Sequence, residues 1–148
     1  MPTSSYNKFN DYEEQLHRGT HNFYSHTFKV ALTNTAPVAS QTGLDTVTNH
    51  PPPAATNGYT AGGNTITMNA AEASGTFTAS ADKTTFTAAG GNLGPFRYAI
   101  LYNDSATSPA DALISWWDYG SSITLADGES FDVIFNSDAT DGTIFTNV

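Results

Sequence analysis

The chain has 148 residues, of which 39% are hydrophobic and 13% are charged, and its formal net charge is −9. The length suits a single domain with one core. The acidity argues against binding to nucleic acid or to an anionic membrane. There are no cysteines, which excludes disulfides and thiolate metal sites and favours folding in a reducing cytoplasm. We expect one domain, residues 1–148.

The N-terminal segment is the only good helix candidate. Asn7 or Asn10 can cap a short helix, and Gly19 can end it. One narrow apolar stripe falls at helical spacing: Phe9, Tyr12 and Leu16. Because so short a helix needs its stripe packed on something, we expect residues 1–25 to form a helical arm that docks on the domain or on a neighbour.

Residues 26–33 alternate, with Phe28, Val30 and Leu32 on one face, and this pattern predicts a strand. A long irregular loop follows at residues 34–65, with a short strand expected at 45–49. Three consecutive prolines in this loop force extended backbone and remove hydrogen-bond donors: Pro51, Pro52 and Pro53. A loop of this length in a small domain is usually functional or an assembly arm.

Two Thr-Phe-Thr segments, about residues 75–80 and 84–88, flank an Ala-Asp-Lys turn and predict a hairpin with Phe77 and Phe86 on one face. The next segment, "PFRYAILYN", places one set of side chains on a common face: Phe96, Tyr98, Ile100 and Tyr102. Its other face holds apolar residues as well, so we expect this strand to be central in its sheet.

Residues 112–119 and 131–135 predict a second hairpin, with Asp127 and Gly128 as turn residues, and "GTIFTNV" predicts a last strand. Short strands separated by Gly, Asn, Asp and Pro turns are typical of antiparallel sandwiches. The sequence therefore predicts an all-β fold: an antiparallel β-sandwich or jelly-roll-like domain of about eight strands with a short N-terminal helix.

The residues that could carry chemistry have simpler interpretations. His17, His21 and His26 lie close together, but Gly19 separates the first two and no metalloprotease motif is present. No nucleophile elbow or phosphate-binding glycine loop occurs. Four acids could flank a sugar, yet each has a local turn or surface role: Asp118, Asp127, Glu129 and Asp132. We expect no enzyme activity, no catalytic or metal-binding residues and no cofactor.

Trp116 and Trp117 are adjacent, so in a strand they point to opposite faces. We expect one of them in the core. The other then lies at a sheet junction or subunit interface, or forms a platform for a sugar.

Four segments in order resemble a family of small virion structural proteins of tailed bacteriophages: "HTFKVALTNTAP", "NGYTAGGNTIT", "FTAAGGNLGPFRYAILYNDSAT" and "LISWWDYGSSITLADGESFDVIF". The likeness spans about residues 6–135. Each motif is short, and their common order makes the likeness specific. Pro51–Pro53 depart from the family pattern, which leaves the role of the long loop open.

The resemblance implies a capsid decoration, or cement, protein on the outer head surface of the virion, made in the host bacterial cytoplasm. Its partners would be the major capsid protein and neighbouring copies of itself, with a homo-trimer as one arrangement. Collar, tail or fibre-attachment roles, and a glycan-binding β-sandwich module, are the alternatives. Interfaces need apolar anchors, and the candidates are Phe9, Tyr12, Phe23, Tyr24, Pro51, Pro52, Pro53 and Trp117, unless these side chains belong to the chain's own core.

Overall fold

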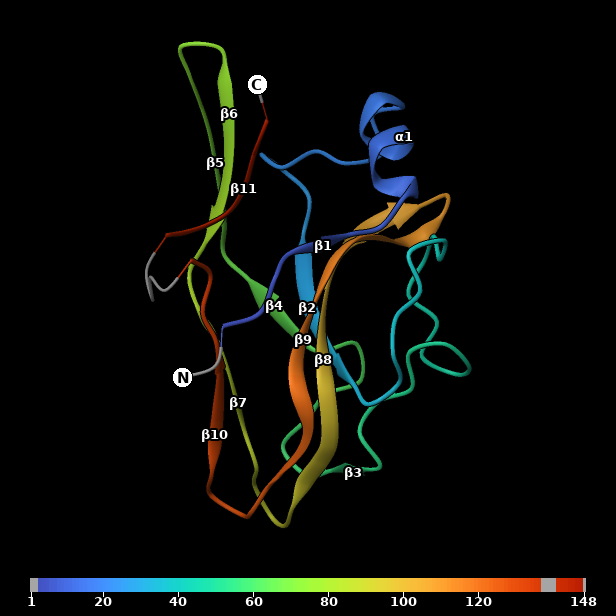
Figure 1. Cartoon of the computed structure of the whole chain (residues 1–148), viewed down its shortest axis with the longest axis vertical. Coiled ribbons are helices and arrows are strands. Elements are labelled where there is room, and N and C mark those ends of the chain that lie inside the picture. The colour runs from blue at the N-terminus through green and yellow to red at the C-terminus, as the bar shows by residue number, and fades with distance from the viewer. Residues whose placement is uncertain (1–2, 137–140, 148) are drawn as a thin grey trace.

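The computed structural model describes residues 3–136 and 141–147, so residues 1, 2 and 148 of the predicted arm and last strand lie outside it. The all-β prediction is confirmed: the described chain consists of antiparallel strands and one helix (Figure 1). The elements are β1 (Asn7–Lys8), α1 (Asp11–His17), β2 (Phe28–Thr33), β3 (Ala55–Thr56), β4 (Asn64–Ile66), β5 (Met68–Ala73), β6 (Thr76–Ala81), β7 (Thr84–Thr87), β8 (Leu93–Thr107), β9 (Ala110–Leu125), β10 (Ser130–Val133) and β11 (Gly142–Asn147).

Three sheets form the sandwich. The main sheet has the order β1-β9-β8-β2-β4, with β3 paired to the end of β8. A three-stranded sheet, β11-β6-β5, and a two-stranded sheet, β10-β7, make the second layer. The main core lies between the layers, and a smaller apolar cluster lies on the opposite face of the main sheet. No helix among the described residues is long and apolar enough to cross a membrane.

Strand β8 lies between β9 and β2 and is buried on both faces, as its sequence predicted. The prediction that Phe96 shares a face with Ile100 and Tyr102 is wrong. Phe96 and Leu101 belong to the main core, whereas Ile100 and Tyr102 belong to the opposite cluster. The β8–β9 register shifts between Phe96 and Tyr98, which reverses the alternation there, whereas Ile100, Leu101 and Tyr102 alternate between the two faces.

The two predicted hairpins are also wrong, although their strands exist. Strand β6 pairs with β5 and β11, and β7 pairs with β10, so the Asp82–Lys83 link joins two different sheets. Phe77 therefore packs near Phe145, and Phe86 near Tyr59. Strands β9 and β10 likewise separate, because β9 continues to Leu125 beside β8.

The N-terminal arm packs across the main sheet (Figure 1). Strand β1 pairs with β9, and the Phe9 amide donates to the Ile114 carbonyl at 3.0 Å. Helix α1 follows Asn10, whose side chain makes no capping bond, and three acids occupy its first turn, where they favour the positive end of the helix dipole: Asp11, Glu13 and Glu14.

In the long loop, the strand expected at residues 45–49 is wrong. This stretch is a turn, because the Asp45 carboxylate accepts hydrogen bonds from the Val47 and Thr48 amides at 2.9 and 3.0 Å. His50 closes the turn, with its ring nitrogen 2.9 Å from Gln41 Oε1. The loop covers the smaller cluster, since Leu44 packs on it.

Candidate functional site

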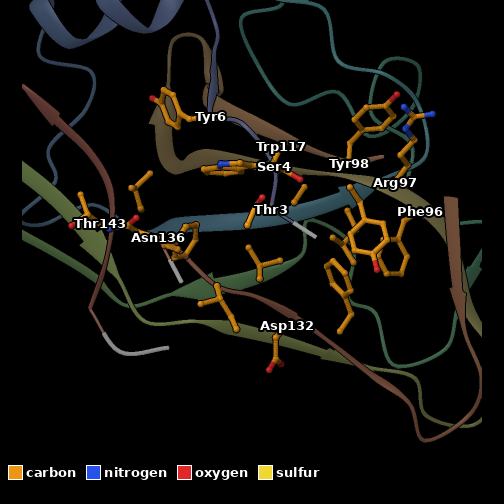
Figure 2. A pocket seen from close by; sticks show the side chains of 18 residues that line it. Thr3, Ser4, Tyr6, Phe96, Arg97, Tyr98, Trp117, Asp132, Asn136 and Thr143 are labelled. Carbon is orange, nitrogen blue, oxygen red and sulfur yellow. The ribbon is translucent and has the colours of Figure 1, made fainter. Parts of the chain in front are cut away.

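An aromatic cleft of about 550 Å³ opens between the main sheet and β10 (Figure 2). Strands β9 and β10 leave the turn at Asp127–Gly128 and join different sheets, so their facing side chains line a space instead of pairing. The N-terminal residues Thr3 and Ser4 lie in its middle (Figure 2). Its aromatic lining comes from several separate segments: Tyr6, Phe96, Tyr98, Trp117, Tyr119, Phe131 and Phe135.

Edge-to-face ring contacts hold the walls of the aromatic cleft. The Phe131 ring lies 5.1 Å from Phe96 and 5.5 Å from Tyr119, measured between centroids. The Trp117 ring lies 5.9 Å from Tyr6 and 5.7 Å from Phe135. Pairs of this geometry contribute about 0.5–1.5 kcal/mol each beyond their buried area, so the walls are preorganised.

The rim of the aromatic cleft carries two ion pairs. Arg97 donates two hydrogen bonds to the Asp118 carboxylate, at 2.7 and 2.9 Å, and these bonds hold the pKa of Asp118 below its usual value. Lys83 and the Thr85 hydroxyl donate to Asp132 at 2.8 and 2.6 Å, which lowers the pKa of Asp132 in the same way. Both carboxylates are therefore ionised and already paired at neutral pH.

The remaining two acids have the turn roles that the sequence predicted. Asp127 accepts a hydrogen bond from the Gly90 amide at 2.8 Å, and Glu129 accepts one from the Ala126 amide at 2.7 Å. All four acids of this region thus have a partner within the chain.

The two tryptophans point to opposite faces of β9, as predicted. Trp116 packs on Phe9, with ring centroids 4.5 Å apart, and Trp117 borders the aromatic cleft. Both are half-buried: Trp117 packs against the main core and Trp116 against the smaller cluster, so the expected division into one core tryptophan and one outside the core is not seen. Trp117 is the tryptophan that lines the aromatic cleft.

Three of the predicted partner-binding aromatics belong to the chain's own core. Phe9, Tyr12 and Phe23 are 0%, 1% and 6% exposed. Phe9 fills the smaller cluster, while Tyr12 and Phe23 enter the main core beside Phe145. In this fold a partner cannot reach them, because the arm packs its stripe on its own domain.

Tyr24 is different, since it is 69% exposed. Its ring centroid lies 6.4 Å from that of Phe77 on β6. Beside it is a groove of about 450 Å³, here termed the Tyr24 groove, lined by Leu16, Gly19, His21, Asn22, Phe23, Tyr24, Phe77 and Asn147. This is the predicted contact residue that the structure leaves open to a partner.

The three prolines of the long loop are less exposed than Tyr24. Pro51 and Pro52 are half-buried and Pro53 is buried. The exposed apolar side chains of the loop are instead Val38 and Val47, at 56% and 87% exposure. The sequence pattern placed Val47 in a short strand, so its exposure was not predicted. The available signal was the pair Asp45 and Asn49, two residues that favour turns and lie on either side of the Thr-Val-Thr segment.

Two of the histidines, His21 and His26, take part in a hydrogen-bonded cluster around Asn103. The buried Asn103 amide donates to the Thr20 carbonyl at 3.1 Å and lies 3.2 and 3.0 Å from the Nδ1 atoms of His21 and His26. Residues 3–136 and 141–147 contain no group of three or more potential metal ligands. Asn103 thus ties β8 to the segment that carries Tyr24.

No protein-family model, no curated protein and no solved structure matches this chain.

Proposed function

We propose that this chain is a non-enzymatic structural protein of a tailed-bacteriophage virion. It decorates the outer surface of the head, binds the major capsid protein and stabilises the contacts between capsid subunits. The observation that carries the proposal is the order of the four segments that resemble this class of protein, because all four occupy the frame of the sandwich: β2, the turn before β4, β8, and β9 with its turn into β10.

These segments also contact one another. The Leu32 amide donates to the Tyr59 hydroxyl at 3.0 Å, which joins β2 to the glycine turn. The Tyr102 hydroxyl donates to the Gly62 carbonyl at 2.6 Å, which joins β8 to the same turn. The Arg97–Asp118 pair joins β8 to β9. The shared motifs are therefore scaffold residues, and contacts with partners fall to the surface around them.

The surface has the composition that such contacts need. Single apolar side chains stand out from an acidic, polar surface, which is the pattern of anchors within a polar rim: Tyr24, Val38 and Val47. A decoration protein stabilises by mass action, because it binds the expanded shell that presents its site and not the disrupted shell.

The test is binding to purified expanded heads that lack the protein. Saturable binding that raises the resistance of the heads to heat is the expected result. Tyr24→Ala should weaken binding by roughly tenfold or more, the effect of losing one anchor. Thr124→Ala, at an exposed position on the main sheet, should leave binding unchanged. Absence of binding to heads, with the protein located on tails or collars, would overturn the decoration role in favour of those alternatives.

A glycan-binding module is the second candidate, and the aromatic cleft favours it. Aromatic faces together with a bidentate Arg–Asp pair are the groups that sugar sites use. A glycan array distinguishes the two functions. Saturable binding that Trp117→Ala removes and Trp116→Ala retains would establish the glycan function, since the two tryptophans lie on opposite faces of β9. Equal binding by both variants would reject the aromatic cleft as the site.

A further inference from the structure

The β5–β6 hairpin extends beyond the body of the domain, with β5 on its outer side (Figure 1). In the three-stranded sheet β5 pairs with β6 alone, so among the described residues no strand covers its other edge. An uncovered edge presents a row of backbone donors and acceptors that can pair with another chain.

The other edges of the described sheets are short, interrupted or covered. Strands β1 and β3 have two residues each and β4 has three. The Asn64 side chain donates to the Thr85 carbonyl on the β7 edge at 2.9 Å. Strand β11 contains a register shift between Thr143 and Phe145, β9 bends at Gly120, whose φ is +100°, and β10 has four residues beside the aromatic cleft.

Strand β5 has none of these protections. Its sequence, Met-Asn-Ala-Ala-Glu-Ala, contains no lysine or proline, and its pairing with β6 is regular over all six residues. Its one charge, Glu72, already accepts a hydrogen bond from the Gly75 amide at 2.7 Å. Natural proteins protect edge strands with short length, lysines, prolines, bulges or a covering segment. The edge of β5 lacks these features, so its backbone groups can pair with another strand.

The hairpin turn fixes which backbone groups are free. The turn has two central residues, Ser74 and Gly75, with φ of 52° and 82°, so Ala73 and Thr76 form its hydrogen-bonded closing pair. Backbone groups alternate in direction along a strand. The odd-numbered residues therefore point to β6, in agreement with the bond from the Asp82 amide to the Thr67 carbonyl. The even-numbered residues point outward: Met68, Ala70 and Glu72.

We propose that β5 pairs antiparallel with β5 of a second copy of this chain, across a twofold axis at Ala70. This register pairs Ala70 with itself and Met68 with Glu72, so that all three outward residues bond in about six hydrogen bonds. Opposite residues then share a face, as a continuous sheet requires. The two Glu72 carboxylates face methionines instead of each other. The biological setting of this pairing rests on the proposed function. Within that function, β5 is the strand through which neighbouring copies meet.

The second copy is the occupant that the strand's own sequence fits. Non-hydrogen-bonded positions oppose Asn69 to Ala71, both exposed and both small enough to avoid a clash. One strand pair buries far less than the roughly 1,200 Å² of a stable interface, so the contact is weak between free molecules. Copies held side by side on a shell meet at high effective concentration, which strengthens such a contact without new atoms.

Disulfide trapping tests the register, and the absence of native cysteines makes it clean. Tagged Asn69→Cys and untagged Ala71→Cys proteins are mixed under mild oxidation. The proposed register brings these residues opposite each other at the spacing that a disulfide needs. A tagged–untagged dimer should form at least about tenfold faster than dimers of Ser121→Cys, an exposed position on β9. A fast dimer of Ala71→Cys alone would overturn the Ala70-centred register.

Ala70→Pro in both partners provides the second arm of the experiment. It removes an outward N–H and leaves the β6-facing bonds intact, so the dimer should disappear while the unfolding midpoint stays unchanged. A mixed-dimer rate equal to that of Ser121→Cys would overturn the inference. If Ala70→Pro also abolished head binding, the edge would belong to a strand of the capsid partner. If the disulfide-linked dimer forms but the protein does not bind heads, the proposed function is rejected and the β5 pairing is retained.

Discussion

At the scale of single residues, Gly63 is where the turn before β4 crosses β2. An added Cβ would lie 1.9 Å from the Val30 carbonyl oxygen, in a backbone with φ of +83°. Gly90 has φ of +82° and nothing within 4 Å of its added Cβ. The two positions therefore share the same backbone strain and differ in the steric clash alone.

We predict that Gly90→Ala lowers the free energy of unfolding by about 1–2 kcal/mol, the cost of the left-handed conformation. Gly63→Ala should cost roughly 4 kcal/mol or prevent folding, because β2 must move to admit the methyl group. Urea unfolding of both variants measures the difference. Equal losses would show that the crossing of the turn over β2 is not tight.

His21 makes stability depend on pH. Burial, together with the charge of nearby His26, lowers the pKa of His21 to about 4 from its ordinary value of 6.5. The folded state therefore binds the proton less readily than the unfolded state does. Stability is complete above pH 6.5 and is lost as the pH falls from 6.5 toward 4.

We predict a loss of roughly 2 kcal/mol in unfolding free energy between pH 7 and pH 5, since one pKa unit is about 1.4 kcal/mol. Protonated Nδ1 also cannot accept the Asn103 amide. His21→Gln should reduce this pH dependence, and His17→Gln, at an exposed position, should retain it. Denaturant titrations at both pH values decide the point. An unchanged slope in His21→Gln would assign the effect to other groups.

At the scale of elements, alternation predicted that β2, β6, β7 and β8 are strands, and apolar residues on both sides predicted that β8 is central. Pairing could not be predicted in the same way. Phe77 and Phe86 follow one local pattern, yet one packs near Phe145 and the other near Tyr59. Alternation depends on neighbours along the chain, whereas the partner of a strand depends on contacts across the whole core.

The candidate contact residues were also predicted only in part. The sequence identified Trp117 and Tyr24 as contact candidates, and the structure leaves both accessible from a cleft or groove. It also identified Phe9 and Tyr12, which are core residues. An apolar helical stripe has the same sequence whether it packs on its own sheet or on a partner. The aromatic cleft could not be predicted, because it exists only where the expected β9–β10 hairpin opens.

The pairing of β7 with β10 yields a prediction of its own. Thr87 and Ser130 are opposite each other, with their hydroxyl oxygens 2.8 Å apart. Thr87→Cys with Ser130→Cys should therefore form an intramolecular disulfide that raises stability by about 4 kcal/mol, as expected for a closed loop of roughly 40 residues. Unfolding with and without reductant measures this gain, and Thr87→Cys alone is the control. Failure to oxidise would contradict the pairing.

At the scale of the whole molecule, the net charge of −9 sets the conditions under which copies can meet. Two such copies repel, and pairing through β5 adds no opposite charges to offset the repulsion. The range of the repulsion falls from about 30 Å at 0.01 M salt to about 8 Å at 0.15 M. Self-association through β5 should therefore strengthen as salt is added.

We predict that the dissociation constant of the dimer falls several-fold between 0.01 M and 0.15 M salt, measured by sedimentation equilibrium. Asp11→Asn with Glu14→Gln, both on α1, changes the net charge from −9 to −7 and should flatten this dependence without touching β5. Association that weakens as salt is added would contradict this prediction. It would mean that attraction between opposite charges on another surface joins the copies, since backbone hydrogen bonds between two strand edges gain nothing from low salt.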